Sequence, residues 1–489
     1  MVWLWVLGGL VLVLAFLAAW RNGTVGAGAG EPPGWDRWFV PLVGETLHFA
    51  RDTVGFLSAR QRRYGNVFHS HLFGQPTLVL IGAEAFAFLY EEERKGRIVS
   101  ANAQLQIFKE ILGDKILNER EDHSFHRAMV TQPILGRSTL QAMLPKMQAN
   151  LARRVEHWVT LGTFEWYTQI KEWAFDNASA LVWGSDISQP SDERHRLFEI
   201  FESMNKGLGG CLPIKLPGTQ YSKCLESRRQ FGETVGALVE ERSRVIKQKV
   251  AELRSDDPLR RIEFKELSVG DDLINNYLFA LIKAQRELPV SEVVDIIAGL
   301  YFAAHHTVTS GLTNIMVALE QRPDVRQKVV EEQETVVGDS EDRFTYEQLN
   351  SMVYLQKARI IRKVGPEDVE YNGYTLKAGR SIYANIILTQ RDPNHFTDPE
   401  TFDPERFSLD RAEDQKAKFA WVVFGGGGHS CLGMKLALLE LKMMTSYLVR
   451  DYDWQAVPGQ DMRIEWAALS PSPKDLYKVR FWQKKQPSA

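Results

Sequence analysis

A long apolar pattern without proline runs from Ser291 to Arg322. It follows Pro289, opens on a serine suited to cap a helix and stops before Pro323, so it predicts a single helix of about 48 Å. Its centre, residues 296–304, is apolar on all sides, which a helix tolerates only where it runs through the interior of a protein. Polar residues in the middle of this helix therefore need a functional reason.

Short strand-like patterns stand apart from this helical spacing. The run Thr77–Ile81 is apolar, and a second strand-like region extends from Tyr371 to Tyr383. Most of the middle of the chain shows helical spacing with charged faces. The sequence therefore predicts a mainly α protein with small β-sheets. Because no internal repeat and no Pro/Ser-rich boundary divides the body after Pro41, we expect one large domain over residues 46–489.

The first twenty residues carry no charge and are almost wholly apolar. They predict a helix of about 30 Å, which is long enough to span a bilayer. The alternative is a cleaved secretory signal, but such signals have a basic leader and a shorter apolar stretch of about 7–15 residues. We therefore expect a transmembrane anchor over residues 1–20 and a flexible, proline-containing hinge over residues 21–45. Arg21 places the body on the cytosolic side.

Composition excludes several classes of function. The 489-residue chain is 44% hydrophobic, enough for a sizeable core, and its formal charge of −3 leaves no basic excess, so we expect no nucleic-acid partner. The three cysteines, Cys211, Cys224 and Cys431, are too few for a disulfide scaffold or a four-cysteine zinc site. A reduced compartment fits this pattern best, with Cys211 and Cys224 as ordinary packed thiols.

The most specific pattern is the glycine-rich run that ends at Cys431 and leads into a helical pattern from Met434 to Arg450. Glycines let a backbone approach a flat group closely. A cysteine at the start of a helix faces unpaired N–H groups, which favour the thiolate, a soft ligand suited to iron. A phosphate-binding loop would need Gly-Lys-Ser/Thr in place of His429-Ser430-Cys431. A turn with an incidental thiol is the other alternative.

Here the sequence resembles the cytochrome P-450 family, whose haem loop reads Phe-x-x-Gly-x-Arg/His-x-Cys-x-Gly. The matching residues are Phe424, Gly427, His429, Cys431 and Gly433. The resemblance covers nearly the whole chain and implies the cytochrome P-450 fold behind the N-terminal helix. It also implies haem b as cofactor, Cys431 as the axial iron ligand and His429 directed at a haem propionate.

The long helix is similar to the family's oxygen-activating motif. Thr307 matches its threonine, and His306 stands where most relatives carry Asp or Glu and the sterol 14α-demethylases carry histidine. The resemblance implies that both deliver protons, although a threonine in a buried helix also commonly bonds back to the carbonyl four residues earlier. A metal site made by His305 and His306 is not expected, because neighbours on a helix point about 100° apart.

Three further residues match propionate-binding positions of the family. His123 and Arg127 lie four residues apart and so share one helix face, for which a solvated charged face is the alternative. Arg362 matches the strand arginine that contacts a propionate. Pro404–Phe407 matches the family's Pro-Glu-Arg-Phe element.

The resemblance implies a monooxygenase that inserts one oxygen atom of O2 into a lipophilic substrate. Residues 212–218 and 471–475 look similar to retinoic-acid hydroxylases, which implies a retinoid, another terpenoid or a sterol. Since no flavin or nicotinamide domain is recognised, we expect a separate redox partner, a reductase or a ferredoxin. With the anchor, the implied location is a single-pass protein of the endoplasmic reticulum whose catalytic domain faces the cytosol.

One family element is missing from the sequence. The family pairs Arg406 with a Glu-x-x-Arg helix that lies between the long helix and the Arg362 strand, but no Glu-x-x-Arg occurs between Thr307 and Cys431. Only seven residues separate Tyr354 from Arg362, about 25 Å when fully extended, which is too short for that helix. The alternative function is therefore a catalytically degenerate haem- or lipid-binding relative.

Overall fold

The computed structural model divides the chain into two compact units, and each is described by itself. The sheet unit comprises Met1–Ala103, Ala358–Thr401 and Ser408–Ser430, and the helical unit comprises the rest. The single domain expected over 46–489 stays a prediction. The structure describes residues 30–34, 44–72, 75–99, 106–113, 120–184, 191–206, 208, 215–255, 257–337, 345–346, 360–465 and 472–484. The predicted anchor at 1–20 and most of the hinge at 21–45 lie outside these residues.

The sheet unit is built on a five-stranded sheet with the strand order β1-β2-β8-β5-β3. Its strands are β1 (Val67–Leu72), β2 (Gln75–Ile81), β3 (Ile98–Val99), β5 (Ile360–Val364) and β8 (Ser381–Asn385). Strands β2 and β8 run parallel, with Thr77 opposite Ser381, and the other pairs are antiparallel. The strand predicted at Thr77–Ile81 is confirmed by β2.

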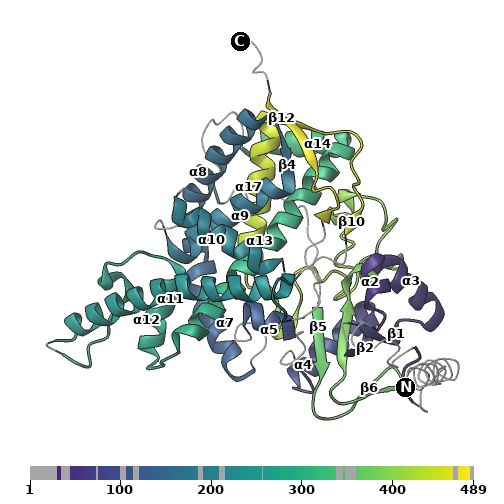
Figure 1. Ribbon diagram of the computed structural model, residues 1–489. Coiled ribbons are helices and arrows are strands. Elements are labelled where there is room, and N and C mark those ends of the chain that lie inside the picture. Colours follow the sequence, from purple (N-terminus) through teal and green to yellow (C-terminus); the bar gives the residue numbers. More distant parts are fainter. Residues whose placement is uncertain are drawn as a thin grey trace, which may run out of the picture. The chain divides into compact units, whose positions relative to one another are not determined.

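The side chains of successive residues in β2 point to opposite faces of this sheet, as strand geometry requires. Leu78 and Leu80 join a core with Phe86 of α4, whereas Val79 packs with Phe56 of α3. The helices of this unit are α2 (Thr46–Arg51), α3 (Thr53–Tyr64), α4 (Ala83–Arg94), α16 (Ile386–Thr389) and the 3-10 helix η3 (Gly427–His429). Figure 1 shows α3 close to β1 and β2.

The second strand-like region contains a hairpin before β8. Strands β6 (Val369–Tyr371) and β7 (Tyr374–Leu376) form an antiparallel pair. The turn that connects them consists of Asn372 and Gly373, whose φ angles are 52° and 78°. Two positive φ angles in a two-residue loop are typical of an Asn-Gly turn that matches strand twist. The prediction of strands between Tyr371 and Tyr383 is therefore confirmed.

The helical unit surrounds one large apolar core. Its helices are α5 (Gln106–Leu112), α7 (Arg120–Leu135), α8 (Arg137–Leu161), α9 (Trp166–Trp183), α10 (Asp192–Asn205), α11 (Gln220–Leu253), η1 (Phe264–Leu267), α12 (Leu273–Lys283), α13 (Val290–Gln321), α14 (Pro323–Val337), η2 (Pro404–Phe407) and α17 (Met434–Asp451). Its strands are β4 (Thr163–Glu165), β9 (Tyr452–Ala456), β10 (Ile464–Glu465), β11 (Ser472–Pro473) and β12 (Lys478–Gln483). The mainly α class with small sheets is confirmed.

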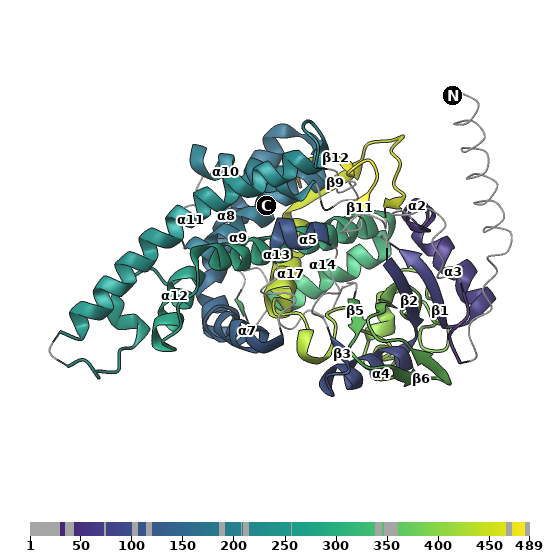
Figure 2. The same cartoon turned by 60° about the horizontal axis from the view of Figure 1, so that its bottom comes forward.

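Helix α13 is the predicted long helix, and its observed ends lie within one residue of the prediction. It packs against α9, α11 and α17 in the middle of this unit (Figures 1 and 2). Residues 296–299 are buried, as expected, but Ala303 is exposed. The apolar centre is therefore covered by protein on most sides and open on one.

None of the helices in the described ranges combines the length and apolar character needed to cross a bilayer.

Candidate functional site

Along the chain, Cys431 lies between the 3-10 helix η3 and helix α17. The 3-10 helix η3 ends at His429, and α17 begins at Met434, so the cysteine lies in the turn that enters α17. Within the helical unit α17 packs against α13 and α14. The helix predicted from Met434 to Arg450 is confirmed by α17.

The glycines of this loop have two different surroundings. A Cβ on Gly426 would lie 2.6 Å from Cε2 of Tyr90, and one on Gly427, where φ is +66°, would lie 3.0 Å from Oε2 of Glu93. Both neighbours belong to α4, so packing against α4 requires these two glycines. A Cβ on Gly428 or Gly433 would meet no described atom within 4 Å. The expectation that the glycines admit a flat group thus fits Gly428 and Gly433, but not Gly426.

His429 is placed by the same helix. Its Nε2 atom lies 3.6 Å from the Glu93 carboxylate, and the Glu93 side chain is largely buried. The sequence signal for His429 was its place in the loop motif, whereas nothing in the pattern of α4 marked Glu93 as its neighbour.

The Cys431 thiol is more weakly acidic than expected. Surrounding protein atoms desolvate it and raise its pKa above the ordinary value, while the Gly433 N–H and the Arg127 charge act in the opposite direction. Desolvation therefore opposes the N–H group in the unliganded chain, and the expectation that the start of α17 favours the thiolate stays a prediction. A thiol must lose its proton to bind iron, so haem binding and deprotonation are coupled.

Arg127, one of the predicted haem-contacting residues, lies near Cys431 in the structure. It is half-buried on α7, and this desolvation lowers its guanidinium pKa, while the Cys431 charge raises it. His123 also lies on α7, and Arg362 lies on β5, but their side chains are outside the described part of the chain. Phe424 is half-buried in the sheet unit.

Thr307 occupies the open face of α13. It is exposed, as is Ala303 one turn earlier, and its Oγ1 donates a hydrogen bond to the Ala303 carbonyl at 2.8 Å. This is the backbone bond that a threonine commonly makes in a helix. The exposure distinguishes it from Thr309, which makes the same bond to the His305 carbonyl at 2.8 Å but is fully buried.

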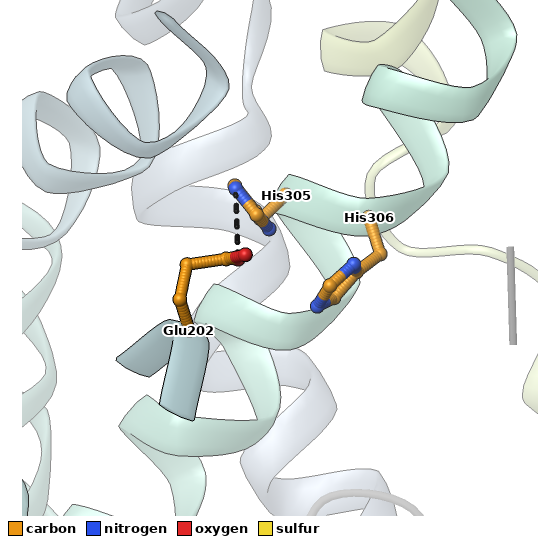
Figure 3. A group of neighbouring side chains, drawn as sticks. All are labelled: Glu202, His305 and His306. Atoms are coloured by element: carbon orange, nitrogen blue, oxygen red, sulfur yellow. Dashed lines mark ion pairs between the residues drawn. The ribbon is translucent and has the colours of Figure 1, made fainter. Parts of the chain in front are cut away.

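His306 belongs to a cluster that the sequence did not predict. One potential ligand atom each from Glu202, His305 and His306 lies within 4.8 Å of the others. Figure 3 shows the Glu202 side chain reaching from α10 toward His305, with His306 at the next position of α13. The two imidazole centroids are 4.6 Å apart, so the angular separation of neighbours on a helix does not keep these rings apart.

Arg406, the residue whose family partner is missing, is buried on η2. Its Nε donates to the Asp403 carbonyl at 3.0 Å. The segment that would carry the missing helix, residues 347–359, lies outside the described residues, as does the local imitation of the motif at residues 356–359.

These residues fit a haem. Within the helical unit, Cys431 offers one thiol for a soft metal, Gly433 presents bare backbone without a covering atom in the described part of the chain, and α13 exposes Ala303 and Thr307. A flat group bound through a single thiolate needs these three features.

Comparison with known proteins agrees with this geometry. The cytochrome P-450 family model matches residues 32–479. The chain belongs to the cytochrome P-450 family, has its fold and is a haem-thiolate monooxygenase. Members of this family act on lipophilic substrates and receive electrons from a redox partner.

Individual relatives cover nearly the whole chain. A putative cytochrome P-450 120 of Synechocystis is 32% identical over 463 residues, covering 92% of this chain and 96% of the relative. An abscisic acid 8'-hydroxylase of Solanum lycopersicum is 27% identical over 479 residues, covering 92% and 91%. The solved structure of a retinoic acid-bound cyanobacterial CYP120A1 has a TM-score of 0.78 and 29% identity, covering 94% of this chain and all of that one.

These findings correct the predicted location. The prediction of a single-pass protein of the endoplasmic reticulum is wrong, because the chain is similar over most of its length to cyanobacterial proteins.

Proposed function

We propose that this chain inserts one oxygen atom of dioxygen into a retinoid or another terpenoid, with sterols as the remaining class. The observation that carries the proposal is the arrangement within the helical unit. The exposed Cys431 precedes α17, which packs against α13, and α13 leaves Thr307 exposed beside Ala303. A thiol ligand and a hydroxyl on an apolar face are the parts needed to bind a haem and move protons near a lipophilic substrate.

Haem b is the proposed form of the cofactor. Covalent c-type attachment needs Cys-x-x-Cys-His, and the three cysteines of this chain do not have that spacing. When bound, the haem supplies the iron that binds and activates dioxygen. Cys431 would hold the iron through Sγ. The other proposed haem contacts are Phe424, Gly427, Gly433, His429, Arg127, Arg362 and His123.

Proton delivery is assigned to Thr307 and His306. The Thr307 hydroxyl donates a hydrogen bond to the Ala303 carbonyl. The lone pairs of its oxygen can therefore accept a hydrogen bond from a proton donor on the exposed side of the helix. His306 Nε2 has no hydrogen-bond partner among the described residues, so it is free to exchange a proton with a neighbour.

The substrate class rests on the comparisons. One relative is named for abscisic acid and the structural neighbour contains retinoic acid. Both molecules are isoprenoid carboxylic acids, which supports a terpenoid acid before a sterol. A separate reductase or ferredoxin would supply the electrons.

Reduced carbon monoxide spectra and product analysis test this function. We expect the purified chain to show the thiolate signature and to hydroxylate retinoic acid or abscisic acid when given a ferredoxin system. Haem loading without product from either acid or from a sterol would overturn the substrate proposal.

The missing Glu-x-x-Arg helix favours a second candidate, a haem- or lipid-binding relative without turnover. The family pairs Arg406 with the glutamate of that helix, and a carboxylate forms a stronger hydrogen bond to a guanidinium than a neutral group does. Inserting a Glu-x-x-Arg helix and its turn between Gln356 and Arg362 should then raise the haem-to-protein ratio. Full haem loading in the chain without the insertion would show that the missing helix does not impair haem binding, and would contradict this second candidate.

A further inference from the structure

The Glu202, His305 and His306 cluster holds three polar atoms without partners. Within the described residues, no hydrogen bond reaches Oε1 of Glu202, Nδ1 of His305 or Nε2 of His306, and all three atoms are buried. Buried polar atoms are nearly always paired, so three orphans in one place need an explanation.

The tautomer of His305 is set by its other nitrogen. Nε2 lies 2.9 Å from the Lys171 carbonyl, and a carbonyl can only accept, so Nε2 carries the hydrogen. Nδ1 of the neutral ring then carries a lone pair. A backbone carbonyl that orients a histidine through its second nitrogen is the usual outer contact of a metal-bound imidazole.

Glu202 is oriented in a similar way. Its Oε2 pairs with the Lys171 ammonium, which leaves Oε1 on the side of His305. Oε1 lies 3.8 Å from His305 Nε2, too far for a hydrogen bond. One lysine residue therefore fixes both side chains, His305 through its carbonyl and Glu202 through its ammonium.

Aromatic rings that donate no hydrogen bond lie against both imidazoles. The faces of Phe201 and Phe302 cover His306, and Phe175 and Phe198 lie against His305. A metal ion accepts lone pairs from all three atoms at once, whereas a proton would satisfy only two.

We propose that Glu202, His305 and His306 form a binding site for one divalent transition-metal ion, for which Zn²⁺ is the best match. An ion bound there occupies Nε2 of His306, so the proton exchange proposed for this atom belongs to the metal-free chain. Two imidazoles and one carboxylate are a common zinc ligand set, with a fourth position left for water. Ligands about 2.1 Å from a tetrahedral ion are about 3.4 Å apart, and one ligand atom from each of the three residues lies within 4.8 Å of the others. Because His305 Nε2 donates to the Lys171 carbonyl, Nδ1 is the atom that a side-chain rotation must bring to the ion.

Lys171 is the charged group that opposes the ion. Its ammonium repels a cation and competes for Glu202, so we expect binding in the micromolar range. Removing this charge should tighten binding, which distinguishes a metal site from a cluster that Lys171 merely stabilises.

The test is metal titration of the full-length, haem-loaded protein after chelator dialysis. Zn²⁺ is titrated against a chromophoric chelator, and Co²⁺ absorption reports tetrahedral nitrogen and oxygen ligands. We expect one ion per chain in the wild type, at least tenfold weaker binding in Glu202→Gln and in His306→Gln, and severalfold tighter binding in Lys171→Met.

The matched control lies on the same helix α10. His195 and Glu199 form an exposed pair 3.4 Å apart, so His195→Gln removes a histidine beside a glutamate without touching the buried cluster. It should bind Zn²⁺ like the wild type. Absence of binding in the wild type, or equal binding in the wild type and both ligand variants, would overturn the proposal. Thermal melts of each variant check folding, and the Lys171→Met result decides the case if a ligand variant is unstable.

Discussion

The Glu93 carboxylate on α4 lies 3.6 Å from Nε2 of His429 in the cysteine loop. A haem propionate directed at His429 would bring a second carboxylate to the same imidazole. Because the Glu93 side chain is only 9% exposed, its charge is weakly screened by solvent. The two carboxylates then compete for one histidine.

We therefore expect Glu93→Gln to slow haem loss by about twofold to fivefold, the effect of a weak charge pair. Haem transfer to apomyoglobin measures the rate. Glu84→Gln, an exposed change on the same helix, serves as the control and should leave the rate unchanged. Faster haem loss in Glu93→Gln would show instead that Glu93 orients His429 for the propionate.

Replacing Cys431 by serine should abolish the thiolate signature of the reduced carbon monoxide complex. An alcohol is a poor ligand for this iron and stays protonated. Cys224→Ser is the control, because Cys224 is fully buried and its Sγ contacts the Ser203 carbonyl at 3.3 Å. An unchanged spectrum in Cys431→Ser would refute the ligand assignment.

Two threonines on α13 offer a matched pair for proton delivery. Thr307→Val and Thr309→Val each remove a hydroxyl that bonds the carbonyl four residues earlier, but only Thr307 is exposed. We expect Thr307→Val to lower product formation by about 10²-fold, with hydrogen peroxide released in its place, and Thr309→Val to remain coupled. Equal uncoupling in both variants would trace the effect to the helix backbone.

Glu440 should make stability depend on pH. It is buried on α17, accepts a hydrogen bond from Asn177 Nδ2 at 3.1 Å, and burial raises its carboxyl pKa from 4.5 to about 8. Between these values the folded chain keeps a proton that the unfolded chain loses. The free energy of unfolding therefore falls as pH rises through this window, by at most about 1.4 kcal/mol per pH unit from this group.

Urea unfolding of Glu440→Gln measures this effect. The variant should be more stable than the wild type near pH 8 and about equal to it near pH 4.5, because glutamine has no charge to bury. Glu334→Gln, an exposed change on α14, should show no such pH-dependent difference. A constant difference across the range would mean that the carboxyl is not protonated in the folded chain.

The long helix could be predicted from sequence because its signals are local. Pro289 and Pro323 bound the apolar run, and α13 spans Val290–Gln321. The Asn372-Gly373 turn is similarly local, since both residues tolerate positive φ.

The surroundings of the site could not be predicted in this way, because distant residues decide them. Glycine is required at positions 426 and 427 because a Cβ there would meet Tyr90 and Glu93 of α4. No periodicity in the sequence links α4 to that loop. Helix geometry separated His305 from His306, but side-chain rotation and Glu202 from α10 bring three ligand atoms together. No local signal marked Glu202, because charged residues are common along α10.

The pairing of β2 with β8 also has a consequence during translation. The Gly82 N–H just after β2 donates to Oγ1 of Thr389 at the end of α16, the helix that follows β8, a buried bond across 307 residues. At roughly 5–20 residues per second, the ribosome needs about 15–60 s to make that stretch. Until β8 emerges, the apolar edge of β2 has no strand to pair with, and unpaired edges promote aggregation. Cys431 is synthesised later still, so this nascent chain must stay soluble well before it can bind its cofactor.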